Sequence, residues 1–293
     1  ISMNRVTTLL EGETGTGKEV IAKVIHEVGV TRNRPFVAVN CSALTETLLE
    51  SELFGHVKGA FTDAIRDKTG KFELAADGTI LLDEISEISP NIQLKLLRVI
   101  QESEFERVGG EKTIAMKARI IASTNKSLEQ LVEIGKFRED LYYRLKVFNI
   151  VLPPLRERLV DIPYLVNFFI NKSNPILQKN INNITRVALD MLMSHLWPGN
   201  IRELEHSITR AMLVCNSNTL DVHHFNIEKP KSLYDKPNDV NTPLLTLSEM
   251  EKKHIINALK VLHWKKSQVA SVLGISRPTL NQKILQYGIV EQE

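Results

Sequence analysis

Gly12-Glu13-Thr14-Gly15-Thr16-Gly17-Lys18 follows directly on an apolar run, 6–10, and precedes an amphipathic segment, 19–28. The three glycines allow the backbone to turn tightly and to aim its N–H groups inward, and the lysine places a positive charge where the β- and γ-phosphates of a nucleotide bind. A helix that begins at this point adds the positive end of its dipole. The stretch therefore predicts a strand, a phosphate-binding loop and a helix, with Gly12, Glu13, Thr14, Gly15, Thr16, Gly17, Lys18 and Glu19 as nucleotide-binding residues.

Further apolar runs alternate with helical segments along the first half of the chain. They are Phe36–Val39, Thr79–Leu82, Ala118–Ala122 and Val147–Leu152. Continuously apolar strands separated by helices are typical of a parallel sheet that is covered on both faces. The sequence therefore predicts an α/β fold.

Two adjacent carboxylates, Asp83 and Glu84, end the run Thr79–Leu82. Ligands of this fold class bind at the carboxyl edge of the sheet, so both acids are expected beside the nucleotide. This is the Walker B pattern, in which Asp83 would hold Mg²⁺ and Glu84 would polarise the attacking water. Paired acids after a strand are also common in solvated turns, but the preceding phosphate-binding loop favours hydrolysis of ATP.

The pattern of the chain changes after Pro153-Pro154. From 161 to about 227 the periodicity is helical and the β signal disappears, and 229–242 is polar with no periodicity. These changes predict an ATPase core over 1–155, a helical lid over 156–228, a linker over 229–246 and a C-terminal domain over 247–293. Because the chain begins close to its first strand, the core is expected to lack its N-terminal part.

The C-terminal domain is predicted to contain a helix over 247–262 and a helix-turn-helix formed by 266–273, Gly274 and 277–287. Ser276 is expected to cap the last helix, with Pro278 in the first turn. The segment 265–283 carries four basic residues and no acidic one, which suits double-stranded DNA, although such helix pairs also serve only for packing. The predicted DNA-binding residues are Lys266, Ser276, Arg277, Thr279, Asn281, Gln282 and Lys283, and the predicted buried ones are Ile275, Leu280, Ile284 and Leu285.

Several motifs together resemble one protein family. In the phosphate-binding loop Glu19 stands where a Ser or Thr usually follows the lysine, and the chain also contains SELFGH at 51–56, GAFTDA at 59–64, FRED at 137–140 and WPGNIREL at 197–204. In this combination the chain resembles the bacterial enhancer-binding proteins, which are AAA+ activators of sigma-54 RNA polymerase, over nearly its whole length.

The resemblance implies roles for further residues around the nucleotide. Thr124 and Asn125 look like sensor I, which responds to the γ-phosphate, and Arg202 looks like sensor II. Asn40 resembles the switch residue that holds Glu84 away from water until the state of the γ-phosphate changes.

Arg138 and Arg144 look like the arginine fingers that AAA+ subunits insert into a neighbouring nucleotide site. By the resemblance, hydrolysis requires a ring, expected to be a hexamer. Without the surrounding matches, ion pairs with Glu139 and Asp140 would be the simpler interpretation of these arginines.

The hexapeptide Gly59, Ala60, Phe61, Thr62, Asp63 and Ala64 resembles the loop that contacts sigma-54. The family has glycine at the position of Asp63, so this chain gains a charge there and loses the conformational freedom of glycine. The change leaves open a loop with weakened or altered coupling to the polymerase, and an ordinary hairpin is a further alternative.

The sequence thus predicts a cytoplasmic, Mg²⁺-dependent ATPase that binds enhancer-like DNA and remodels the sigma-54 RNA polymerase holoenzyme. Two alternatives remain: an AAA+ ATPase with another client, and a DNA-binding regulator in which ATP controls only assembly.

The chain contains no apolar run near 20 residues and no apparent signal segment, so no membrane partner is expected. Cys41 and Cys215 are far apart, without metal-ligand spacing, and are expected in the core.

Overall fold

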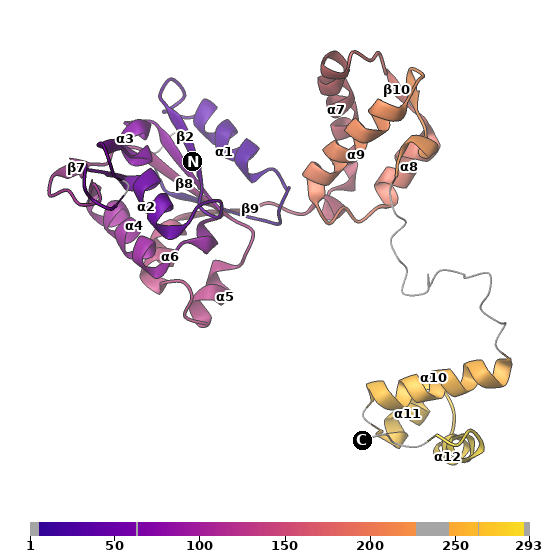
Figure 1. Cartoon of the computed structure of the whole chain (residues 1–293). Helices are drawn as coiled ribbons and strands as arrows, with labels where there is room; N and C mark the ends of the chain where they lie inside the picture. Colours follow the sequence, from indigo (N-terminus) through magenta and orange to yellow (C-terminus); the bar gives the residue numbers. More distant parts are fainter. Residues whose placement is uncertain (1–5, 63, 227–245, 263, 290–293) are drawn as a thin grey trace. The chain divides into compact units, whose positions relative to one another are not determined.

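The computed structural model describes residues 6–62, 64–226, 246–262 and 264–289 (Figure 1). The chain divides into two units, 1–230 and 231–293. The predicted linker, apart from Thr246, lies outside the described residues.

A five-stranded parallel sheet forms the centre of the first unit, in the order β2-β5-β8-β1-β9. The predicted α/β fold is therefore confirmed. Every residue of β8 is buried, which explains why its sequence lacks the alternation of a half-exposed strand. The strand bounds are β1 Thr8–Glu11, β2 Phe36–Asn40, β5 Thr79–Asp83, β8 Arg119–Thr124 and β9 Phe148–Val151.

Helices cover both faces of this sheet (Figure 1). Leu9 and Leu10 are neighbours in β1 but belong to different hydrophobic clusters, because successive side chains of a strand point to opposite faces. Helix α1 packs with Leu10 on one face, and the remaining helices of the core pack on the other. The helices are α1 Lys18–Glu27, α2 Glu46–Phe54, α3 Lys71–Ala75, α4 Pro90–Glu102, α5 Leu128–Glu133 and α6 Glu139–Leu145.

Two small antiparallel ribbons were not predicted from the sequence. One joins β3, Gly55–His56, to β4, Lys68–Thr69, and the other joins β6, Glu104–Glu106, to β7, Thr113–Ala115. With two or three residues a strand, they are too short for a period-two pattern to be recognised. The GAFTDA hexapeptide lies between β3 and β4, and its Asp63 lies outside the described residues.

The lid consists mainly of helices α7 Ile162–Leu177, α8 Arg186–Ser194 and α9 Asn200–Val214. The expectation that no β structure follows Pro153-Pro154 was wrong, since β10 Asn183–Ile184 and β11 Thr219–Leu220 form a short parallel pair. Trp197 is fully buried in the lid core, and its indole N–H donates to the carbonyl of Leu192 at 2.8 Å.

None of the helices within the described part of the chain combines the length and the apolar character that crossing a bilayer requires. Both cysteines are buried free thiols, as expected. In the core, burial raises the pKa of the Cys41 thiol to about 12.

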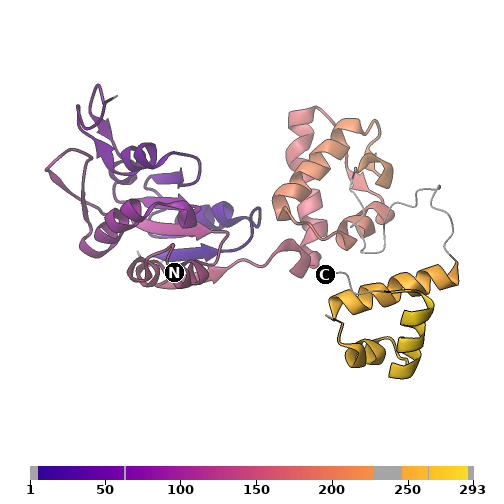
Figure 2. The same cartoon turned by 60° about the horizontal axis from the view of Figure 1, so that its bottom comes forward.

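The second unit contains α10 Leu247–Val261, α11 Lys266–Val272 and α12 Arg277–Gln286, drawn in yellow in Figure 2. The Ser276 hydroxyl accepts a hydrogen bond from the Thr279 amide at 3.2 Å, so the predicted cap is confirmed. The placement of Leu285 was wrong: its side chain is 83% exposed, because it lies about 100° around the helix from the buried Ile284. Leu280 is buried as expected, and Ile275 is half-buried.

Candidate functional site: a nucleotide cavity between the sheet edge and the lid

The phosphate-binding loop has a backbone that requires glycine at two positions. Gly15 and Gly17 have φ values of +80° and +99°, which side-chain-bearing residues rarely adopt. A Cβ on Gly15 would also lie 2.3 Å from the carbonyl oxygen of Gly199, a lid residue. The loop is therefore shaped both by its own turn and by close contact with the lid.

Lys18 is buried at the first position of α1. Its Nζ donates to the carbonyl oxygens of Gly12 at 2.7 Å and of Glu13 at 3.2 Å. Burial lowers the pKa of this ammonium group, and the carboxylates of Glu84 and Asp83 oppose that effect. A poorly solvated cation at the mouth of a glycine-rich loop is suited to bind phosphate oxygens.

The two Walker B acids have different surroundings. Asp83 accepts a hydrogen bond from the Ser123 hydroxyl. Glu84 has a φ of +56°, and its Oε2 is buried without a hydrogen-bond partner in the described residues. Burial raises the pKa of Glu84, while the Lys18 ammonium counteracts the rise. Glu84 lines the cavity, and a carboxylate at this position can orient a water molecule.

The predicted sensor and switch residues are only partly brought together. Asn125 Nδ2 donates to Thr14 Oγ1 at 3.0 Å, so the sensor position contacts the phosphate-binding loop. Thr124 is fully buried and bonds to the backbone of Lys126 instead. The Asn40 amide oxygen accepts from the backbone N–H of Ser42 at 2.9 Å and from its hydroxyl, so in this structure it is not committed to Glu84.

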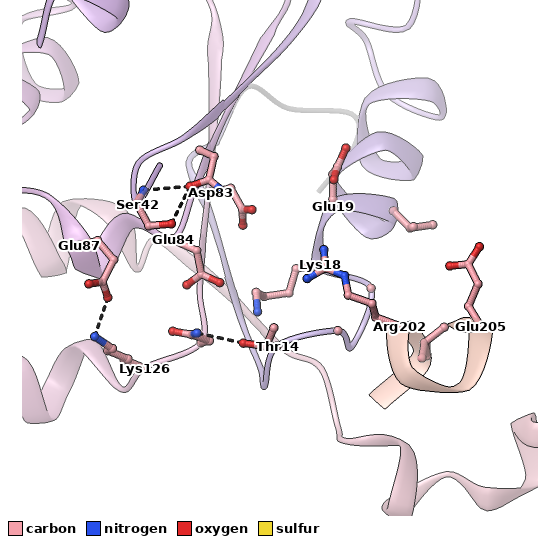
Figure 3. A pocket seen from close by; sticks show the side chains of 16 residues that line it. Thr14, Lys18, Glu19, Ser42, Asp83, Glu84, Glu87, Lys126, Arg202 and Glu205 are labelled. Atoms are coloured by element: carbon pink, nitrogen blue, oxygen red, sulfur yellow. Dashed lines mark hydrogen bonds and ion pairs between the residues drawn. The ribbon is translucent and has the colours of Figure 1, made fainter. Parts of the chain in front are cut away.

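These elements enclose a cavity of about 670 Å³, which is large enough for a nucleoside triphosphate. Figure 3 shows Lys18, Asp83 and Glu84 from the core around the same space as Arg202 from the lid. The predicted residues that line it are Thr14, Gly15, Gly17, Lys18, Glu19, Asn40, Asp83, Glu84, Asn125 and Arg202, whereas Gly12, Glu13, Thr16 and Thr124 do not.

The donor set fits a Mg²⁺ ion that arrives with a nucleotide. Within the described residues no group of three or more His, Cys, Asp or Glu side chains could hold a metal ion. Mg²⁺ in nucleotide sites is bound by one or two carboxylates together with phosphate oxygens and water, which matches the paired acids Asp83 and Glu84.

Neither predicted arginine finger lines the cavity of its own chain. Arg138 precedes α6 and forms a two-bonded ion pair with Asp140, through Nε at 3.0 Å and Nη2 at 2.7 Å. Arg144 is exposed in the last turn of α6 and has no ion-pair partner among the described residues.

The GAFTDA loop is anchored at its base. The Phe61 ring packs edge-on against His56, with ring centroids 4.9 Å apart, and His56 Nδ1 lies 2.7 Å from the Ser51 hydroxyl. Val57 N–H donates to the Val108 carbonyl at 3.1 Å, and a Cβ on Gly109 would lie 2.8 Å from the Ala60 Cβ. The loop therefore packs directly on the turn that connects β6 and β7.

Three of the seven predicted DNA-binding residues are exposed on α12, Ser276 is exposed at its N-cap, and Lys266 is half-buried at the start of α11. Arg277, Asn281 and Gln282 are exposed, and Thr279 is half-buried beside the capping Ser276. Lys283, also predicted to bind DNA, is half-buried, and its Nζ lies 2.6 Å from a carboxylate oxygen of Glu251 in α10.

Sequence reasoning missed two residues of the site. Arg156 donates to both carboxylate oxygens of Glu13, at 2.8 and 2.6 Å. Asn200 is fully buried and bonds to Glu13 Oε2, to the Thr14 carbonyl and to the Leu155 N–H. The asparagine of WPGN, at the start of α9, was a usable signal, but its partners lie far away in the sequence.

Family models match three segments of the chain. Residues 1–151 match the Sigma-54 interaction domain, 156–239 match the AAA+ ATPase lid domain, and 246–287 match the bacterial regulatory proteins of the Fis family. These matches agree in order with the core, the lid and the C-terminal helices.

Similar proteins and structures point to the same family. The chain is 48% identical to the Nif-specific regulatory protein of Azotobacter vinelandii, over 92% of this chain and 52% of that protein. It is 44% identical to the regulatory protein AtoC of Escherichia coli K12, over 99% of this chain and 64% of that protein. The chain thus spans about half to two-thirds of the length of these relatives.

The fold is shared with solved structures of NtrX from Brucella abortus. The complex with ADP superposes with a TM-score of 0.72 at 31% identity, covering 99% of this chain and 66% of that one. The complex with ATP gives a TM-score of 0.68 at 32% identity, covering 98% and 65%. The chain belongs to the sigma-54-dependent transcriptional activators, the AAA+ family in which this ATPase module is joined to a Fis-type helix-turn-helix.

Proposed function

We propose that this chain is a Mg²⁺-dependent ATPase that assembles as a ring, binds DNA and remodels sigma-54 RNA polymerase in the cytoplasm to activate transcription. The observation that carries the proposal is the convergence of Lys18, Asp83, Glu84 and Asn125 from the core and Arg202 from the lid on one cavity. Each of these groups has a separate task in transferring the γ-phosphoryl group to water.

Lys18 and Arg202 would bind the phosphates of ATP, and Asp83, already fixed by Ser123, would hold Mg²⁺. When bound, Mg²⁺ neutralises charge on the phosphates and helps to orient them. Glu84, which lines the cavity, would orient and deprotonate the attacking water. Asn125, bonded to Thr14, would respond to the presence of the γ-phosphate.

A ring, which we propose to be a hexamer, would complete each site in trans. Because Arg138 and Arg144 lie outside the cavity of their own chain, they can serve only a neighbouring nucleotide. Arg144 is the better placed of the two, since Arg138 is already paired with Asp140. An arginine supplied in this way stabilises charge on the transferring phosphoryl group.

The GAFTDA loop would contact sigma-54 and change position with the nucleotide state. One support is the family match of this segment. The other is the packing of the loop on the β6–β7 turn. In the chain, this turn comes after α4, and α4 comes after the Walker B strand β5. Phe61 and Thr62 provide apolar and hydroxyl contacts for the partner. Asp63 lies outside the described residues, so its contribution rests on the sequence alone.

Turnover of ATP tests the enzymatic part of the proposal. We expect phosphate release in the presence of Mg²⁺ that rises more steeply than linearly with protein concentration, because each site needs a neighbour. Removal of Mg²⁺ with EDTA should abolish turnover. Absence of turnover at concentrations where a ring has formed would instead support a DNA-binding regulator in which ATP controls only assembly.

Binding to DNA is expected to depend on Arg277. The side chain is exposed at the start of α12, where a recognition helix presents groups to the major groove and the phosphates. Arg277→Ala should weaken DNA binding about 10-fold. It should also reduce the slope of the logarithm of the binding constant against the logarithm of the salt concentration by about one. Titration of a labelled duplex at several salt concentrations measures both effects. Arg186→Ala, at an exposed lid arginine, is the matched control and should change neither.

A further inference from the structure

The second residue of the phosphate-binding loop, Glu13, is an unexpected neighbour for a polyphosphate. A carboxylate beside Lys18 would repel a nucleotide if it faced the cavity. It does not line the cavity. Its carboxylate is bound by Arg156 and Asn200 instead, and the hydrogen bonds from these two side chains lower its pKa to about 2.

Asn200 occupies the centre of this contact. It is fully buried at the first position of α9 with a φ of +53°, a conformation that asparagine tolerates better than most residues. Its amide nitrogen donates to Glu13 Oε2 at 3.1 Å and to the Thr14 carbonyl at 3.0 Å, while its amide oxygen accepts from Leu155 N–H at 2.7 Å. One buried side chain of α9 therefore bonds both to the phosphate-binding loop and to Leu155, where the chain passes from the core to the lid.

Two further hydrogen bonds to backbone carbonyls of the loop extend this junction. The Ile201 N–H donates to the carbonyl of Gly15 at 2.9 Å, and Arg158 Nη2 donates to the carbonyl of Thr16 at 2.8 Å. Residue 202, directly after this junction, is the arginine that lines the cavity. The position of Arg202 relative to Lys18 is thus fixed through a few contacts to the loop.

We propose that Glu13, Arg156 and Asn200 form a latch, a positioning network that holds the start of α9 on the phosphate-binding loop and so places Arg202 on the bound nucleotide. The three residues act through Arg202 and do not touch the phosphates themselves. Because the contact joins core and lid, opening the latch should free Arg202 while Asp83 and Glu84, which make no contact with the three residues, stay in place. The consequence for turnover rests on the proposed ATPase function, but the latch itself can be measured without it.

Asn200→Asp is the sharpest test, since it changes one NH₂ group to oxygen at constant shape. The substituted side chain can still accept from Leu155 N–H but directs a carboxylate oxygen at Glu13. Repulsion between the two carboxylates should open the latch. Adding Glu13→Gln should restore part of the contact, because the repelling charge is removed.

Hydrogen exchange of the Ile201 amide gives a readout that needs no catalysis. We expect exchange to accelerate at least tenfold in Asn200→Asp and to slow again in the double variant. Glu157→Gln, which removes an exposed charge next to Arg156, is the matched control and should leave exchange unchanged. Unchanged exchange in Asn200→Asp, or no recovery in the double variant, would overturn the latch.

Kinetics and nucleotide binding then test the link to Arg202. Asn200→Asp should raise the KM for ATP about tenfold, and the Kd measured at equilibrium with a fluorescent ATP analogue should rise similarly. In an Arg202→Ala background the same substitution should add no further effect. A loss that persists in full in that background would show that the network acts only on stability.

If the wild-type chain bound ATP without hydrolysing it, the ATPase proposal would fail, while exchange and analogue binding would still decide on the latch.

Discussion

Glu84→Gln is expected to reduce ATP turnover by about 10²- to 10⁴-fold while ATP remains bound. The amide keeps the shape of the side chain but cannot accept a proton from water. Burial raises the pKa of Glu84, so the carboxylate takes up a proton at a higher pH than an ordinary glutamate does. As the pH is lowered, wild-type turnover should therefore begin to fall earlier than it would with a glutamate of ordinary pKa. Phosphate release and binding of a fluorescent ATP analogue, each measured from pH 5 to 8, separate the two functions.

The control for this substitution is Glu87→Gln, at a nearby acid that also lines the cavity but is paired with Lys126. It should retain most of the turnover, because the proposal gives Glu87 no proton to accept. Loss of ATP binding in Glu84→Gln, or turnover equal to that of wild type, would contradict the assignment of Glu84 as the base.

Arg144→Ala should lower turnover by about 10³-fold, the scale of an arginine finger supplied in trans. The residue is exposed and lies outside the cavity of its own chain, so a single isolated subunit offers no reason for this loss. Arg186→Ala, at an exposed arginine of the lid, is the matched control and should retain full turnover.

Mixing the two inactive variants gives the more specific result. In a mixed ring, the intact Glu84 of an Arg144→Ala subunit meets the intact Arg144 of a Glu84→Gln neighbour. Turnover should therefore reappear when Glu84→Gln and Arg144→Ala are combined. A mixture no more active than its components would argue against completion of the site by a neighbour.

The parts of this fold that were predicted correctly depend on local pattern. The strand and helix around Lys18 were predictable because glycine spacing, an apolar strand and an amphipathic helix are adjacent in sequence. The buried strand β5 and the acids that end it were predictable for the same reason. The cap at Ser276 also depends on a neighbour only three residues away.

Contacts over long sequence separations were not predictable from one sequence. Asn200 and Glu13 are 187 residues apart, and no periodicity links them. The position of Glu13 within the glycine-rich loop suggested a nucleotide ligand, whereas its partner Arg156 turns the carboxylate toward the lid. Leu285 was placed inside because it is apolar, although its neighbour Ile284 already occupies the inward position.

The most direct test of the central claim is co-migration of the full chain with purified sigma-54 in the presence of ADP and aluminium fluoride, which mimics the transition state of hydrolysis. A complex should form with this mimic, should be absent with ADP alone, and should be lost in Thr62→Ala even though ATP turnover persists. A chain that hydrolyses ATP but forms no complex with sigma-54 under these conditions would rule out the proposed contact and indicate another client for the ATPase.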